Sequence, residues 1–245
     1  MISLLYPIKN RLPLFKNTID SILSYYNGIK NKFEIILLSN ILENDLKNYV
    51  LELKNILNIS YIIYNYPNHY CEMINPAYAF NLGCNLSKYN SIILSSPEIK
   101  HKTPVIKQLL ELTGQNILCK VEELDNNGKL IQLLMGEKEP DRKNNPGMYF
   151  IGMYNKKDYI DIGGLDEKYM IGLGYEDKDF GLRFMHNFTT TDSIVGIHQQ
   201  HPRYYHYNYL YSCNAKLLER KRENLITVAN SNIKMGDISY IERII

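Results

Sequence analysis

The chain has 245 residues, of which 45% are hydrophobic and 22% are charged, and its formal net charge is +2. This length fits one large α/β domain better than two small ones, and the composition is ordinary for a soluble globular protein. The nearly neutral charge argues against a dominant nucleic-acid surface, so we expect no nucleic-acid partner. No apolar run approaches the roughly 20 residues that a membrane span requires, so we expect no membrane span.

The cysteines and the N-terminus indicate a cytoplasmic protein. The four cysteines are scattered without a CxxC spacing, which predicts free thiols in a reducing compartment. Residues 1–7 read as a first strand and lack the basic and apolar regions of a secretory leader. The many tyrosines and the absence of tryptophan suggest an AT-rich genome, so the expected location is the host cytoplasm if the source is viral.

Predicted strands and helices alternate over the first hundred residues. The strands cover residues 2–6, 33–38, 60–64 and 91–95, and the helices between them cover residues 13–26, 46–57 and 75–86. The run 33–38 is continuously apolar, as in a parallel strand covered on both faces. This order predicts a parallel, doubly wound sheet with ligands bound beyond the carboxyl ends of its strands.

The pattern changes after a helix predicted at residues 104–112. Strands at 116–123 and 129–135 flank Asp125-Asn126-Asn127-Gly128, a typical hairpin turn. Residues 136–147 are polar and contain two prolines, so we expect a mobile loop that can act as a lid. Further strands are predicted at 148–154 and 193–198, and a basic helix at 207–228.

The stretch from Gly163 to Phe184 organises the rest of the chain. Its first part is rich in glycine and reads as a loop, because glycine permits positive φ. A helix is then predicted to begin at Glu176, with Asp177 and Asp179 in a first turn where the helix dipole favours negative charge. On these residues alone, a well-capped helix without a catalytic role is the alternative.

The whole string closely resembles the acceptor-side segment of GT-A glycosyltransferases, those of the family 2 type and the β-1,4-galactosyltransferases. Their pattern runs Gly-Gly-hydrophobic-Asp-Glu, then Gly-x-Gly-x-Glu-Asp-x-Asp, then Arg. In those families the Asp after Glu is the catalytic base, and here that position is Asp177. The resemblance implies that Glu176 belongs to the catalytic site with Asp177, and that Glu176 and Asp166 hold acceptor hydroxyls or brace the loop. It also implies that the acceptor site includes Gly163, Gly164 and Asp166.

Two earlier segments resemble donor-binding parts of the same families. Residues 6–11 resemble the nucleotide-binding start of family 2 enzymes, which implies donor contacts from Pro7, Asn10 and Arg11. Equally, these residues read as a plain loop that leads into a helix. Residues 75–83 resemble the segment that precedes the metal-binding strand and add Asn81 to the donor site, although Asn also commonly caps helices and satisfies backbone groups.

Residues 96–98 stand where these families have Asp-x-Asp. Ser96 replaces the first Asp, so it is expected at the donor, and Glu98 keeps a carboxylate that can bind Mn²⁺ or Mg²⁺. His198 matches the histidine that completes the metal site in GT-A enzymes, and His201 and Arg203 are expected at the donor phosphates. The alternatives are that Glu98 is a surface glutamate and that the histidines lie in a loop without a function. The spacing of His198 and His201 also occurs in zinc hydrolases, but here no glutamate shares a helix with the two histidines.

The resemblance covers residues 2 to about 203 and implies an α/β fold. It predicts a single GT-A (Rossmann-like) domain over residues 1–245, with a mostly parallel central sheet covered by helices and a smaller acceptor-side β element. Residues 1–100 would form the nucleotide-sugar half, residues 101–206 the acceptor half and residues 207–245 a C-terminal helical tail.

The predicted function is that of an inverting, metal-assisted glycosyltransferase. It would move a sugar from a nucleotide sugar, expected to be a UDP-sugar, to a hydroxyl of a glycan, glycolipid or protein, with Asp177 as general base. A non-catalytic module that kept the fold and binds a nucleotide sugar or glycan is the alternative. Ser96 favours that alternative, whereas Glu176-Asp177 argues against it.

Overall fold

A computed structural model describes residues 1–29, 31–65, 76–125, 127–135, 150–171, 174–184, 188–202, 208–224, 226–231 and 234–245. The predicted lid at 136–147, Asn75 and the predicted donor residue Arg203 lie outside these residues. None of the helices described is long and apolar enough to cross a membrane.

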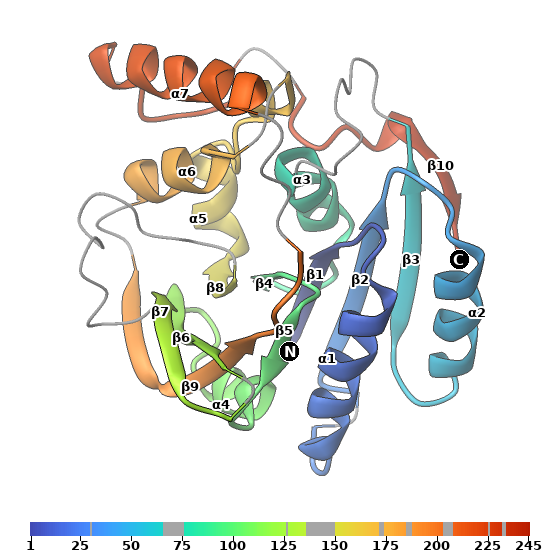
Figure 1. The fold of residues 1–245 in the computed structure, drawn as a ribbon. Coiled ribbons are helices and arrows are strands. Elements are labelled where there is room, and N and C mark those ends of the chain that lie inside the picture. Colours follow the sequence, from blue (N-terminus) through green and yellow to red (C-terminus); the bar gives the residue numbers. More distant parts are fainter. Residues whose placement is uncertain are drawn as a thin grey trace.

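In the described part of the chain, all ten strands belong to one sheet, which runs through the middle of the molecule (Figure 1). Its order is β10-β3-β2-β1-β4-β8-β6-β9-β5, and β7 pairs with β6 as a hairpin. In chain order the strands are β1 (Ile2–Pro7), β2 (Phe33–Ser39), β3 (Ile59–Tyr64), β4 (Ser91–Ser95), β5 (Ile99–His101), β6 (Ile117–Leu124), β7 (Leu130–Met135), β8 (Ile151–Asn155), β9 (Thr189–His198) and β10 (Ile241–Ile244).

The first half of the chain forms the predicted parallel, helix-covered sheet. Strands β3, β2, β1 and β4 are mutually parallel, and α1 (Leu12–Ser24), α2 (Asn44–Leu53) and α3 (Pro76–Leu86) connect them. Every residue of β1 and of β2 is buried, as their apolar runs require. Helix α3 packs closely against β1 and β2 at Gly83, where an added Cβ would lie 3.0 Å from the Leu38 side chain and 3.2 Å from that of Leu5.

The second half extends the same sheet with mixed strands. Strand β8 is antiparallel to β4 and to β6, whereas β9 is parallel to β6. Around it lie α4 (Val105–Glu111), α5 (Lys156–Asp161), η1 (Glu167–Ile171), α6 (Glu176–Phe184) and α7 (Asn208–Glu223). An aromatic cluster packs α5 and α6 onto β8: Tyr154, Tyr159, Phe180 and Phe184, with centroid distances of 5.3–6.4 Å.

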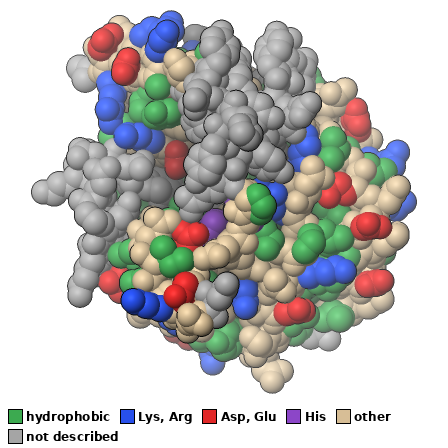
Figure 2. All heavy atoms as spheres, in the orientation of Figure 1, with side chains coloured by type: hydrophobic (Ala, Val, Ile, Leu, Met, Phe, Trp, Pro, Cys, Tyr) green, Lys and Arg blue, Asp and Glu red, His purple; other side chains and the backbone are tan. Residues whose placement is uncertain are grey.

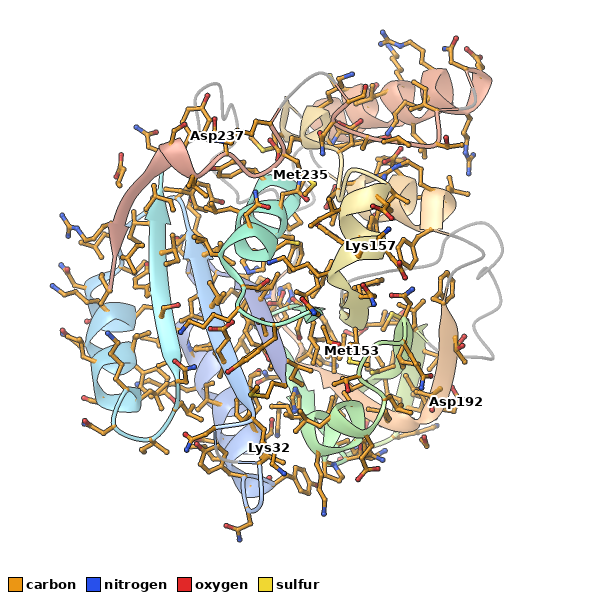
Figure 3. All side chains as sticks on the ribbon, turned by 180° about the vertical axis from the view of Figure 1, so that it is seen from behind. Lys32, Met153, Lys157, Asp192, Met235 and Asp237 are labelled. Atoms are coloured by element: carbon orange, nitrogen blue, oxygen red, sulfur yellow. The ribbon has the colours of Figure 1, made fainter. Side chains whose placement is uncertain are left out.

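Several short elements differ from the sequence prediction. The sequence did not predict β5 or α5, which are only three and six residues long. The expected helical tail 207–245 is helical in α7, but the chain then turns through η2 (Ile238–Tyr240) and adds β10 antiparallel to β3. Helix α7 ends at Glu223, and the turn that follows it contains Asn230 and Gly236 with positive φ. Figure 3 shows Met235 and Asp237 on this returning segment, close to α3.

Candidate active site

Glu98, His198 and His201 form one cluster although they come from distant parts of the chain. Glu98 follows β4, and His198 is the last residue of β9. The short strand β5 joins them, because it begins at Ile99 and pairs antiparallel with β9, with Ile99 opposite His198. Each of the three residues offers a ligand atom, and these atoms lie within 4.8 Å of one another. The cluster unites the two predicted metal ligands with a residue predicted for the phosphates.

Arg11 adds a positive charge to this cluster. His201 Nε2 lies 3.3 Å from Glu98 Oε1, Arg11 Nε lies 4.0 Å from the same oxygen, and Arg11 Nη2 lies 3.4 Å from His201 Nδ1. Burial alone would raise the pKa of Glu98, but hydrogen bonds from His201 and Ser96 and the charges of His201 and Arg11 hold this pKa below its usual value. Conversely, the hydrogen bond to Glu98 raises the pKa of His201.

The chemistry of the cluster fits a divalent cation. The carboxylate suits Mn²⁺ and the two imidazoles suit divalent transition metals in general, so the three residues together form a donor set for a divalent transition-metal ion. Three protein ligands leave further coordination positions for phosphate oxygens. The side chains of Glu98 and His201 are 13% and 14% exposed, so the cluster is shielded but reachable from solvent. Figure 2 shows a histidine side chain at the surface near the middle of the drawn face, next to an acidic one.

Gln199 fixes the two segments that carry this cluster. Its backbone N–H and its side-chain Nε2 both donate to the Glu98 carbonyl, at 3.0 and 3.1 Å. The same Nε2 donates to the Leu14 carbonyl at 2.9 Å, and Asn17 in α1 donates to Gln199 Oε1 at 2.8 Å. Sequence reasoning missed this residue, because its role depends on the pairing of β5 with β9.

The other predicted donor residues lie at the carboxyl end of the parallel sheet or next to it. Pro7 ends β1, and Asn10 has a φ of 55° and donates its backbone N–H to Glu43 Oε1 at 2.8 Å. Arg11 is the N-cap residue of α1, and Ser96 follows β4 with its side chain hydrogen-bonded to Glu98. The structure therefore brings Arg11 and Ser96 to the cluster.

Asn81, a predicted contact of the donor, lies inside the protein and bonds to the glycine-rich loop. It is fully buried in α3, and its Nδ2 donates to the Leu165 carbonyl and to Glu167 Oε1, both at 2.8 Å. Its Oδ1 accepts from the Tyr159 hydroxyl at 2.6 Å and from the Leu165 N–H at 3.1 Å. Asn81 thus holds the glycine-rich loop onto α3. Its predicted contact with the donor stays a prediction, because both ends of its amide are hydrogen-bonded within the protein.

The predicted acceptor residues 163, 164 and 166 are also built into the packing. Gly163 and Gly164 have φ of 77° and 60°, and an added Cβ would lie 2.0 Å from the Ala229 carbonyl oxygen and 2.3 Å from Asn81 Oδ1 respectively. Asp166 is 2% exposed and pairs with Lys221 of α7, whose Nζ lies 2.9 Å from Asp166 Oδ2. These contacts shape the loop, and whether it also touches an acceptor stays a prediction.

The acidic helix α6 begins at the predicted residue. Tyr175 precedes it with a φ of 70°, a left-handed conformation that is uncommon for a non-glycine residue. Glu176 is 3% exposed, whereas Asp177 is only half-buried. Loss of water around the Asp177 carboxyl raises its pKa, although backbone N–H groups, including that of Lys178 at 2.7 Å, oppose this shift. A carboxylate with a raised pKa is a suitable proton acceptor.

Comparisons with known proteins agree with this architecture. Residues 142–209 match a family model described as the N-terminal domain of galactosyltransferase. No curated protein sequence matches the chain. Among solved structures, TarS of S. aureus superposes with a TM-score of 0.67 at 13% identity, over 91% of this chain and 40% of TarS.

Two further structures carry nucleotide sugars. TarS 1–349 in complex with UDP-GlcNAc has a TM-score of 0.65 at 13% identity, over 83% of this chain and 59% of that one. The mannosyltransferase PcManGT from Pyrobaculum calidifontis, in complex with GDP-Man and Mn²⁺, has a TM-score of 0.60 at 10% identity, over 91% and 64%. The chain thus spans 40–64% of the length of these three structures, and it has the predicted GT-A-like α/β fold.

Proposed function

We propose that this protein is an inverting glycosyltransferase that moves a sugar from a nucleoside-diphosphate donor to an acceptor hydroxyl. The observation that carries the proposal is the convergence of Glu98, His198 and His201 at the end of β4 and β9. It is supported by the GT-A-like fold, whose neighbours include complexes with UDP-GlcNAc and with GDP-Man and Mn²⁺. The UDP-sugars are the first donors to test, and a glycan, a glycolipid or a protein would supply the acceptor hydroxyl.

Glu98, His198 and His201 would hold Mn²⁺ or Mg²⁺. When bound, such a cation neutralises charge on the leaving diphosphate. Arg11 lies beside the cluster and could turn its guanidinium from Glu98 to a phosphate oxygen, because its planar fork matches phosphate geometry. We place Pro7, Asn10, Ser96 and the predicted phosphate ligand Arg203 around the same donor.

Asp177 would perform the proton transfer. Its carboxylate takes the proton of the acceptor hydroxyl while that oxygen forms a bond to the anomeric carbon. The bond from this carbon to the diphosphate breaks on the opposite face, and its electron pair remains on the diphosphate, so the configuration inverts. Glu176, which is buried next to this position, would orient the acceptor or brace the turn, together with Asp166 and the loop at 163–164.

A panel of nucleotide sugars tests the proposal, with Mn²⁺, with Mg²⁺ and with EDTA. A ligand that binds only the folded state raises the melting temperature by mass action. A free ligand concentration of 100 times Kd raises the free energy of unfolding by roughly 2.7 kcal/mol. We expect one donor to raise the melting temperature in a cation-dependent way, and then to be consumed when an acceptor is present. Absence of any cation-dependent donor shift would overturn the proposal.

Binding without turnover would instead favour the non-catalytic module.

A cytoplasmic location is part of the proposal, and it is supported by Cys84, Cys119 and Cys213, which are free thiols.

A further inference from the structure

Lys221 of α7 belongs to a buried network of charges that joins α7 to the acidic helix α6 and to the glycine-rich loop. Its Nζ is 2.9 Å from Asp166 Oδ2 in the glycine-rich loop and also contacts Asp179 Oδ1 in α6. Asp179 Oδ2 accepts from Arg183 Nε at 2.8 Å. All four side chains are between 2% and 6% exposed, so two carboxylates are balanced by two cations away from water.

Arg183 extends the network to the backbone of the loop. Its Nη1 donates to the Ile162 carbonyl and its Nη2 to the Gly164 carbonyl, both at 2.8 Å. The loop and α6 are therefore tied together through Asp166, Asp179 and the two cations. Lys221 is the member of this network that comes from α7, the helix that lies over α6 in Figure 1.

Asn214 makes a second contact from the same face of α7. It precedes Lys221 by seven residues, which is two helical turns, and Leu218 lies buried between them. Asn214 is fully buried, and its Nδ2 donates to the Tyr169 carbonyl at 3.0 Å and to the Gly174 carbonyl at 2.7 Å. Tyr169 lies in η1, and Gly174 directly precedes Tyr175 at the start of α6.

The geometry points to α7 as a brace that positions Asp177, with Lys221 and Asn214 as its positioning residues. Residues two apart in a helix point about 200° away from each other. Holding Asp179 inward therefore directs Asp177, two residues earlier, to the other side of α6, where its side chain is half-buried. Both positioning residues lie beyond residues 142–209, which match the galactosyltransferase family. This inference rests on the proposed function of Asp177.

Loss of the Lys221 charge should displace Asp177 and leave the donor site intact. Without Lys221 the buried network keeps two carboxylates and one cation, so the loop and α6 must shift or admit water. Displacement of a reacting group by about 1 Å can cost 100-fold in rate. In contrast, Glu98, His198 and His201 depend on β4, β5 and β9, which Lys221 does not contact in any described interaction.

The test compares Lys221→Met with Lys221→Arg and with the control Lys216→Met, which makes the same change at an exposed position of α7. We expect kcat for transfer to fall about 10- to 100-fold in Lys221→Met, while Kd for the donor with Mn²⁺ stays within about twofold. Lys221→Arg should recover most of kcat, because it restores the charge, and Lys216→Met should match the wild type. All rates are expressed per molecule that binds donor, so a lower folded fraction does not imitate the effect.

Hydrogen exchange provides a measurement that does not need turnover. In Lys221→Met, amides at 162–167 and 174–180 should exchange faster, whereas those of β1, β2 and β4 should not change. If Lys221→Met does not fold, Asn214→Ala takes its place, since it removes two hydrogen bonds without a change of charge. Wild-type kcat and exchange in the variant that folds, or an equal loss of donor binding, would overturn the brace. A wild-type protein without transferase activity would refute the proposed function, while the exchange data would still decide on the brace.

Discussion

Asn81 in α3 donates to the carboxylate of Glu167 at 2.8 Å, although the two residues are 86 positions apart in the sequence. The same oxygen, Glu167 Oε1, accepts from the backbone N–H of Gly236 at 2.7 Å. One buried contact therefore joins the parallel half of the sheet, the glycine-rich loop and the segment that returns to β10. This arrangement leaves little space at Gly164, where Asn81 Oδ1 would lie 2.3 Å from an added Cβ.

Gly164→Ala should therefore strongly destabilise the protein. The φ of 60° costs an L-residue roughly 1–2 kcal/mol, and the contact with Asn81 adds an overpacking cost of typically 1–3 kcal/mol. We expect a free energy of unfolding lower by about 2–5 kcal/mol, measured by urea denaturation. Gly28→Ala is the matched control, because its φ is 81° and nothing lies within 4 Å of the added Cβ. An equal loss in both variants would mean that backbone strain alone, and not packing against Asn81, fixes this glycine.

Removal of one side chain of the cluster should weaken Mn²⁺ binding, and with it the cation-dependent binding of the donor. Glu98→Gln keeps the size of the side chain but removes its charge, and His198→Ala removes an imidazole ligand. Loss of a hydrogen-bonding partner of a metal ligand typically weakens metal binding about 10- to 100-fold, so loss of a ligand itself should cost at least as much. Titration of Mn²⁺, followed through the paramagnetic signal of the free ion, checks this directly, and Glu52→Ala on the exposed face of α2 is the control. Unchanged Mn²⁺ affinity in both cluster variants would contradict the site.

The regular parts of the fold could be predicted because their signals are local. The apolar runs at 33–38 and 91–95 predicted β2 and β4, and the acidic first turn predicted that α6 begins at Glu176. The antiparallel return of β10 could not be predicted, since four residues at an exposed edge carry no distinctive pattern. Lys221 looked like one basic residue among several in α7, and only the tertiary structure reveals its burial against Asp166 and Asp179.

His101 should make the protein less stable in acid. It lies in β5 at 6% exposure, and burial lowers its pKa from 6.5 to about 3. Between these values the unfolded chain binds a proton that the folded protein does not bind. The stability that the neutral His101 contributes is therefore fully present above about pH 6.5, and it is lost as the pH falls from there toward about 3. At pH 4.5 the loss is roughly 2–3 kcal/mol, at 1.36 kcal/mol per pH unit.

His101→Leu, which cannot titrate, isolates this effect from that of the carboxylates. Unfolding by urea at pH 7 and at pH 4.5 gives the change in free energy for each protein. The wild type should lose about 2–3 kcal/mol more than the variant between the two pH values. The same loss in both proteins would show that His101 becomes protonated without unfolding.

Asp177 provides the decisive prediction for catalysis. A positioned general base typically contributes 10²- to 10⁴-fold, which is roughly 3–5 kcal/mol of the barrier. Asp177→Asn keeps the shape of the side chain and can still accept from the Lys178 N–H, but it cannot take a proton. We expect kcat for transfer to fall at least about 100-fold, with donor affinity unchanged. Glu176→Gln should cost less, and mainly in KM for the acceptor.

The pH dependence of kcat provides an independent check on the same residue. Loss of water around its carboxyl raises the pKa of Asp177. As the pH falls, kcat should therefore decrease at pH values that are still above the ordinary aspartate pKa of about 3.9. The rate should therefore rise with pH through this raised pKa, and the residual rate of Asp177→Asn should lack that rise. If Asp177 and Glu176 only stabilise the first turn of α6, Asp177→Asn and Glu176→Gln would instead each lower the free energy of unfolding by a few tenths to about 1 kcal/mol, with turnover unchanged. Near-normal turnover in Asp177→Asn, with a lower melting temperature, would therefore favour the capped helix over the catalytic base.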